Sequence, residues 1–469
     1  MKRISSILAA GVLAVSIAGC DKYLDKLDNP NLVVEPPLNG LLTTSTYQTA
    51  YDAFLMGDIT SYYTQYLASN SRASDGDIYN EVDYSGTWES FYAAMMNIQQ
   101  MITKAEANKA YKHLGVGKIL MAYNLNMLIN SFGDVPFSEA LKGLDLLIPT
   151  FDKQADLHQT CLTLVNDGIT ELKKQDVSMD LNSSNDLIHQ GSVSAWIKTA
   201  YALKARFLTQ FTKTPDYDPA EVLSTLNDAY ESNADDAALT VFDGRSPWNA
   251  VSYNNTQLDL DGWLSTQYVD ALNGTTYGVE DPRLPLIASI TKFGDYRGTP
   301  NGAGRIGTGT DDEESYLWIN GYYSKGNAPL LLVSYAEMKF IEAEAAFRSN
   351  DPQTAYDAYL DGIRLHMEKV GVAQAARNAY LSNPAVAVGK DNLTLDLIFK
   401  EKYVVMFLNP ESWVDARRFD YKYKDFTLPQ NAAMNSFIRR LAYPTVETSR
   451  NGKNVPPVSG LDERLIWDK

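Results

Sequence analysis

One segment of the chain, residues 329–348, constrains the fold more than any other. A short apolar run ends at Ser334, whose hydroxyl can accept a hydrogen bond from a free backbone N–H at a helix start. The next residues place Met338, Ile341 and Ala345 on one helix face, at the three- and four-residue spacing of a buried stripe. Alanines beside this stripe leave room for close packing. The segment therefore predicts one half of a packed helical hairpin.

Helical patterns dominate much of the remaining chain. We predict helices over residues 46–68, 88–108, 115–132, 155–174, 194–212, 219–233, 335–348, 353–370 and 393–408. Asp391 or Asn392 is expected to cap the last of these, which should end before Pro410. The pair joined by the turn at residues 350–352 resembles one unit of a tetratricopeptide repeat.

The pattern changes between residues 234 and 329, where glycine, asparagine and aromatic residues recur without sustained helical periodicity. We call residues 234–329 the excursion. Loop-rich segments of this length inside a compact domain are usually functional or disordered, and the many aromatic residues argue against disorder. We therefore expect an all-α fold, in which tetratricopeptide-like hairpins form a scaffold and the loop-rich aromatic excursion carries a ligand site.

Further segments resemble a single protein family from the first third of the chain to its last residue. They are residues 132–141 (FGDVPFSEAL), 281–284 (DPRL), 398–420 (IFKEKYVVMFLNPESWVDARRFD), 440–444 (RLAYP) followed by Glu447 and Asn451, and 465–469 (LIWDK). With the hairpin above, they make the chain closely similar to the SusD/RagB family. Its members are outer-membrane lipoproteins that capture nutrients, mostly glycans, for a TonB-dependent transporter. The resemblance implies one SusD-like domain over residues 36–469.

The N-terminus indicates a lipoprotein on its own evidence. Lys2 and Arg3 precede an apolar stretch, residues 4–17, that is too short to be a stable membrane span. Residues 17–20 (IAGC) have the small-residue pattern of a bacterial lipobox. We expect residues 1–19 to be a signal peptide and the thiol of Cys20 to be acylated, because two or three acyl chains hold a protein durably on a bilayer. An ordinary secretory peptide with an incidental cysteine is the alternative.

Residues 20–35 contain Asp21, Asp25 and Asp28, and resemble the acidic tether that follows the lipidated cysteine in surface-exported lipoproteins. We therefore expect lipid anchoring in the outer membrane, with the protein facing outside. The formal charge of −17 argues against nucleic acid as a partner. Cys161, the other cysteine, lies in a helical apolar pattern and is expected to be a small buried hydrophobe.

Catalytic patterns are mostly missing from the sequence. The four histidines lack metal-ligand spacing, and Gly302, Gly304 and Gly307 match G-x-G-x-x-G without the strand and helix that a dinucleotide site needs. Glu337 and Glu344 share a helix face, as a glycosidase pair might, but they alternate with packing residues. We expect no enzyme activity, no cofactor and no metal.

Two acidic features have simpler explanations than catalysis or metal binding. Glu344 can pair with Arg348 one helical turn away. Residues 311–314 (DDEE) could offer oxygen ligands to calcium, but they lack EF-hand spacing and indicate a solvated loop. Residues 413–418 (WVDARR) are expected to belong to the scaffold, as a buried Trp413 ring held by ion pairs.

Ligand capture fits the sequence better. A sugar offers an apolar ring face and a rim of hydroxyls, so aromatic platforms edged by polar groups suit it. Tyrosine outnumbers phenylalanine 29 to 16, so much of the aromatic content carries a hydroxyl. Two loop regions concentrate this chemistry, although loop packing is the alternative for each aromatic. The expected ligand-binding residues are Arg72, Asp77 and Tyr79 in the first region, and Tyr296, Trp318, Asn320, Tyr322 and Tyr323 in the second.

These features together predict a lipoprotein that binds an oligosaccharide and delivers it to a TonB-dependent SusC-like transporter. Two alternatives stay open. One is a tetratricopeptide-like interaction scaffold without a small-molecule site. The other is a peptide cargo in place of a glycan. The excursion favours ligand binding over a bare scaffold, because a scaffold alone has no need of it.

Overall fold

The computed structural model describes residues 36–175, 179–258, 260, 262–307 and 312–469. The signal peptide, Cys20 and the acidic tether lie outside the described residues, as does Asp311 of the acidic run. In the part of the chain that is described, no helix is long and apolar enough to cross a membrane.

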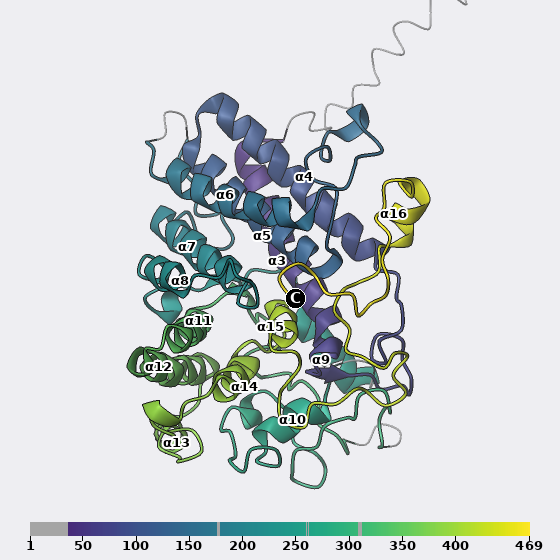
Figure 1. Ribbon diagram of the computed structural model, residues 1–469, viewed down its shortest axis with the longest axis vertical. Coiled ribbons are helices and arrows are strands. Elements are labelled where there is room, and N and C mark those ends of the chain that lie inside the picture. The colour runs from purple at the N-terminus through teal and green to yellow at the C-terminus, as the bar shows by residue number, and fades with distance from the viewer. Residues whose placement is uncertain (1–35, 176–178, 259, 261, 308–311) are drawn as a thin grey trace, which may run out of the picture.

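The scaffold is a stack of helices. Its members are α3 (Leu38–Tyr63), α4 (Ser85–Asn108), α5 (Tyr111–Phe132), α6 (Gln154–Leu172), α7 (Val193–Thr209), α8 (Pro219–Leu226), α11 (Tyr335–Arg348), α12 (Pro352–Val370), α13 (Gln374–Leu381), α14 (Leu395–Val405), α15 (Glu411–Arg418) and α16 (Thr445–Arg450). Neighbouring helices pack in pairs such as α5 with α6 and α11 with α12. Figure 1 shows α6, α7, α8, α11 and α12 following one another along the long axis. The expected all-α fold with tetratricopeptide-like hairpins is confirmed.

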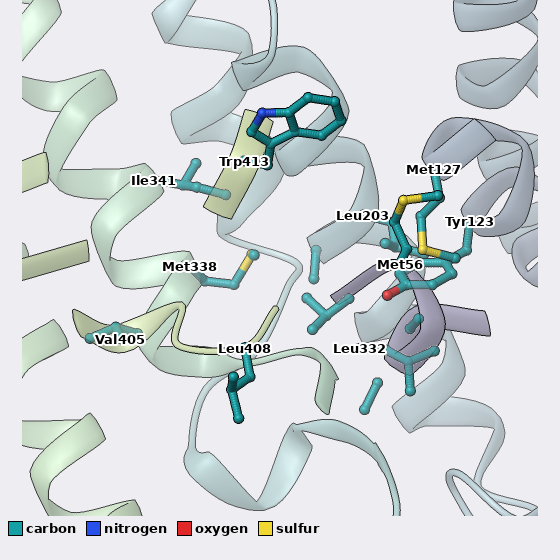
Figure 2. Packing of buried hydrophobic residues seen from close by; sticks show 14 of the residues in the cluster. Met56, Tyr123, Met127, Leu203, Leu332, Met338, Ile341, Val405, Leu408 and Trp413 are labelled. Carbon is teal, nitrogen blue, oxygen red and sulfur yellow. The ribbon is translucent and has the colours of Figure 1, made fainter. Parts of the chain in front are cut away.

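The helix α11 begins and packs as its sequence predicts. The Ser334 hydroxyl accepts a hydrogen bond from the N–H of Glu337 at 3.3 Å, and the Glu337 carboxylate reaches back to the backbone of Ser334. Met338 and Ile341 are buried, and Figure 2 shows them in the same cluster as Met56 of α3 and Trp413 of α15. The hairpin stripe is therefore core, as expected.

Several predicted boundaries were wrong. Helix α3 begins at Leu38 instead of residue 46, and α8 ends at Leu226 instead of residue 233. Thr394 caps α14, whereas Asp391 and Asn392 lie in a preceding short 3₁₀ turn. Pro410 does separate two helices, because α15 begins immediately after it.

The excursion is closed at its base by a small antiparallel sheet. Strand β2 (Ala237–Leu239) pairs with β4 (Leu330–Val333), so the two ends of the excursion are side by side. A second pair joins β1 (Leu67–Ala68), just after α3, to β3 (Trp263–Leu264) within the excursion. The excursion also contains helices α9 (Pro247–Leu258) and α10 (Thr266–Leu272), which the sequence pattern did not predict. Their Asn- and Gln-containing sequences lack a long apolar stripe.

Candidate ligand-binding site

Two loops that are distant in sequence meet at one buried carboxylate. Asp77, from the loop between α3 and α4, accepts hydrogen bonds from the Asn301 amide at 2.5 Å and from the Gly302 N–H at 2.6 Å. It also accepts one from the N–H of Ser69 at 3.2 Å, within its own loop. Burial raises the pKa of Asp77, and these three donors oppose that shift. Asp77 therefore holds the two loops together.

Backbone contacts extend this junction. The N–H of Ala73 donates to the carbonyl of Gly302 at 3.0 Å, and the N–H of Arg305 donates to the carbonyl of Asn70 at 3.1 Å. Gly302 has φ +75°, and a Cβ there would lie 1.8 Å from the carbonyl oxygen of Gln430. Gly302 of the apparent nucleotide motif therefore serves close loop approach.

Beside the junction, aromatic rings form a supported layer. The Arg305 guanidinium lies 3.9 Å from the centre of the Trp263 ring, and Trp263 meets Tyr316 edge-on at 5.8 Å. Leu317 is buried and forms an isolated antiparallel β-bridge with Ala288. Because side chains alternate along an extended segment, Tyr316 and Trp318 lie on the side opposite to Leu317. Both are partly exposed. Two aromatic side chains, two residues apart, therefore lie on the same side of this loop.

The excursion is tied to the scaffold through Arg283 of the segment DPRL. Its buried guanidinium donates to Asp281 and, at 2.5 Å, to Glu401 of α14. Arg283 also donates to Nδ1 of His366 in α12 at 3.3 Å. Because Nδ1 accepts, Nε2 carries the hydrogen and donates to the Tyr323 hydroxyl at 2.6 Å. These hydrogen bonds and ion pairs attach the excursion to helices α12 and α14.

The eight residues expected to bind ligand fall into three groups. Arg72 and Asn320 are exposed, while Tyr296, Trp318 and Tyr322 are partly exposed, so their ligand contacts stay predictions. The other three are buried, so their expected ligand contacts are corrected. Asp77 clamps the loops, Tyr323 bonds to His366, and Tyr79 packs edge-on against Tyr63 at 5.9 Å.

A polar cavity of about 210 Å³ adjoins the loop junction, and its residues were not predicted from the sequence. It lies between the start of α10, the loop at residue 301 and residues 425–430. Asp270 and Asp425 line it, and burial raises the pKa of Asp270, with the Asp425 charge adding to the shift. None of the eight expected residues lines this cavity. The polar residues within the segment 425–431 (DFTLPQN) are a sequence signal that could have pointed to it.

The acidic residues considered for catalysis are held in ion pairs. Glu337 pairs with Arg206 at 2.6 Å, and Glu344 pairs with both Arg418 and Arg348 at 2.9 Å. In the acidic run, Glu314 is buried beside Arg305 rather than solvated, which corrects the expectation for that residue. No group of three or more His, Cys, Asp or Glu residues among those described could hold a metal ion.

A family model described as "Starch-binding associating with outer membrane" matches residues 30–444. The chain belongs to the SusD-like family. The resemblance inferred from the sequence motifs is thereby confirmed. No curated protein matches the chain.

Solved structures share the SusD-like fold over nearly the whole chain. A SusD homolog from Bacteroides fragilis is 22% identical, with a TM-score of 0.75, and the match covers 92% of this chain and 99% of that one. A chitin-binding protein is also 22% identical, with a TM-score of 0.74 and coverage of 92% and 100%. A chitin-binding SusD homolog from Flavobacterium johnsoniae is 18% identical, with a TM-score of 0.76 and coverage of 92% and 98%.

Several SusD-like signature segments contact one another away from the loop junction. The Tyr443 hydroxyl donates to the carbonyl of Asp134 at 2.7 Å, and the Asn451 amide donates to the carbonyl of Pro149 at 2.8 Å. Trp413 is buried, with the Arg417 guanidinium 3.7 Å from its ring centre. These motif residues therefore build the scaffold, as predicted for Trp413.

Proposed function

We propose that this SusD-like protein is a surface-exposed outer-membrane lipoprotein that binds an oligosaccharide and delivers it to a TonB-dependent SusC-like transporter. The observation that carries the proposal is the junction at Asp77, which brings exposed Arg72 beside the excursion loops and their aromatic layer. Apolar ring surface next to polar side chains suits a sugar. The family description and the chitin-binding names of two structural neighbours support a carbohydrate over a peptide.

The ligand site is best tested at Trp318. We expect Trp318→Ala to weaken oligosaccharide binding about tenfold to hundredfold, because truncating an aromatic hot spot costs roughly 1–3 kcal/mol. The fold should stay intact, since the ring is partly exposed on a loop. Calorimetric titration with a panel of oligosaccharides and of peptides would measure the loss and separate the two cargo classes.

Trp413→Ala is the control for that experiment. Its ring is buried against Tyr63 and donates a hydrogen bond to the Tyr421 hydroxyl at 2.8 Å. Removing it should cost roughly 3–5 kcal/mol of stability and lower the melting temperature. If Trp318→Ala instead melts early and binds normally when folded, Trp318 is a packing residue and the proposed site is misplaced.

Anchoring is tested separately at Cys20, the lipobox cysteine. Cys20→Ala removes the acylated thiol, so we expect the protein to leave the membrane fraction. Membrane fractionation with immunodetection of both forms measures this. Unchanged membrane association of the variant would refute anchoring through Cys20.

A further inference from the structure

A second concave site lies on the helical scaffold, away from the loop junction. It is a cavity of about 460 Å³ between α6, α7 and the C-terminal segment. This volume is within the range of small-molecule sites. Figure 1 shows α6 and α7 toward the opposite end of the long axis from α10, where the loops gather. The cavity therefore belongs to neither the loop junction nor the excursion.

Apolar side chains form the floor of this cavity. Leu162 of α6 and Leu208 of α7 line it, together with Phe211 and Ile466. The His158 and Phe211 rings lie 4.2 Å apart, and the His158 ring is held by the carbonyl of Phe207 at 3.2 Å. Phe211 and Ile466 also pack on a small apolar cluster that includes Trp467. The floor is thus braced by contacts outside the cavity and leaves apolar ring surface facing it.

Polar side chains form the rim. Gln159 and Asn166 extend from α6 as exposed amides, and Lys204 of α7 pairs with Glu221 at 3.2 Å. Asp216 adds one carboxylate from the α7–α8 connection. Because Lys204 and Glu221 offset each other, the rim carries amide donors and acceptors and about one net negative charge. This chemistry disfavours an anion and suits a neutral ligand with many hydroxyls.

We propose that this cavity is a second carbohydrate site, which takes one or two neutral sugar units with an apolar ring face against Phe211. The amides of Gln159 and Asn166 hydrogen-bond the hydroxyls at the rim. The inference rests on the proposed function for its class of ligand, but its residues are separate from those of the loop junction. Two separated sites on one body would hold a long glycan at two points and raise its avidity.

The test uses the mature chain carrying Cys20→Ala, with maltose, cellobiose and diacetylchitobiose as probes in saturation-transfer NMR. In a Trp318→Ala background, we expect a residual signal from at least one disaccharide. Adding Gln159→Ala and Asn166→Ala should lower that signal at least fivefold. The matched control is Thr163→Ala with Thr170→Ala, also exposed on α6, where each hydroxyl bonds a carbonyl of its own helix. The control should leave the signal unchanged.

The outcomes separate this inference from the proposed function. If wild type binds a disaccharide and Trp318→Ala binds none, the second site is refuted and the loop site stands. A residual signal that ignores the Gln159 and Asn166 changes also refutes it. If Trp318→Ala binds like the wild type, and adding Gln159→Ala and Asn166→Ala then removes binding, the second site is supported and the proposed loop site is refuted. If wild type binds none of the three probes, the inference is refuted for these sugars, and the oligosaccharide panel decides the proposed function.

Discussion

Single glycines set how closely the loops of the candidate site approach. Gly302 and Gly294 both have a positive φ, +75° and +80°, so a side chain is strained at either position. Their surroundings differ. A Cβ on Gly302 would lie 1.8 Å from the Gln430 carbonyl oxygen, whereas a Cβ on Gly294 would meet nothing within 4 Å. The two positions therefore separate backbone strain from steric exclusion.

We expect Gly294→Ala to cost roughly 1 kcal/mol of unfolding free energy, from the positive φ alone. Gly302→Ala should cost roughly 3 kcal/mol or more, because the loops must also move apart. Urea unfolding of both variants measures the difference. Equal losses of unfolding free energy would mean that the loops can move apart at Gly302 without destabilising the protein. The close approach of Gly302 to Gln430 would then be unimportant for stability.

The sequence located the loops of the site better than it assigned their side chains. Residues near 72–79 and near 300 do meet, but Asp77, Tyr79 and Tyr323 are buried. A polar–aromatic pattern carries no information on depth. Tyr323 has a buried partner in His366, 43 residues later in the chain, and two of the three donors to Asp77 are more than 220 residues away. Such pairings depend on the tertiary fold.

At the scale of elements, an ion-pair network around one buried carboxylate joins three helices. Glu344 of α11 pairs with Arg418 of α15 and with Arg348 at the end of its own helix, both at 2.9 Å. Burial is the largest single influence and would raise the pKa of Glu344, but the charge and hydrogen bond of Arg418, together with the charges of Arg348 and Lys402, lower it to about 2. Lys402 of α14 is linked to the same group through Asp415. The network fixes α11 against α14 and α15.

The two arginines provide a matched pair for mutation. Arg418 is 1% exposed and Arg348 is 28% exposed, at equal distance from the Glu344 carboxylate. We expect Arg418→Leu to cost roughly 3–5 kcal/mol, because it leaves a buried carboxylate with only its partly exposed partner. Arg348→Leu should cost about 1 kcal/mol or less. Urea unfolding at pH 7 measures both, and equal costs would show that burial does not govern this pair.

The Arg418→Leu effect should also depend on pH. In the wild type, the pKa of Glu344 is lowered from its ordinary value of 4.5. The ionised carboxylate therefore stabilises the folded protein fully at pH values above 4.5, and this stabilisation is lost as the pH falls toward about 2. Without Arg418, Glu344 takes up a proton at higher pH and its burial becomes less costly. The difference between variant and wild type should therefore shrink from pH 7 to pH 4.

At the scale of the whole molecule, the scaffold was predictable from the sequence and the build of the excursion was not. Apolar stripes at helical spacing predicted the core of α11 because its stripe faces one continuous cluster. Polar links to distant elements hold the excursion, alongside apolar contacts such as Tyr268 stacked on Phe407 at 4.4 Å. Arg283 reaches Glu401 across 118 residues, and β2 pairs with β4 across its base. Neither link leaves a local periodic signal.

These links predict that excursion and scaffold unfold together. We expect a single calorimetric transition for the wild type. Arg283→Met leaves Asp281 and Glu401 buried with one shared cation removed, which should cost roughly 3–5 kcal/mol and lower the melting temperature. Arg297→Met is the control, because Arg297 pairs with Asp295 inside the excursion and is about half exposed, so it should melt like the wild type. Two separate transitions in the wild type, or equal melting of both variants, would show that Arg283 does not couple the excursion to the scaffold.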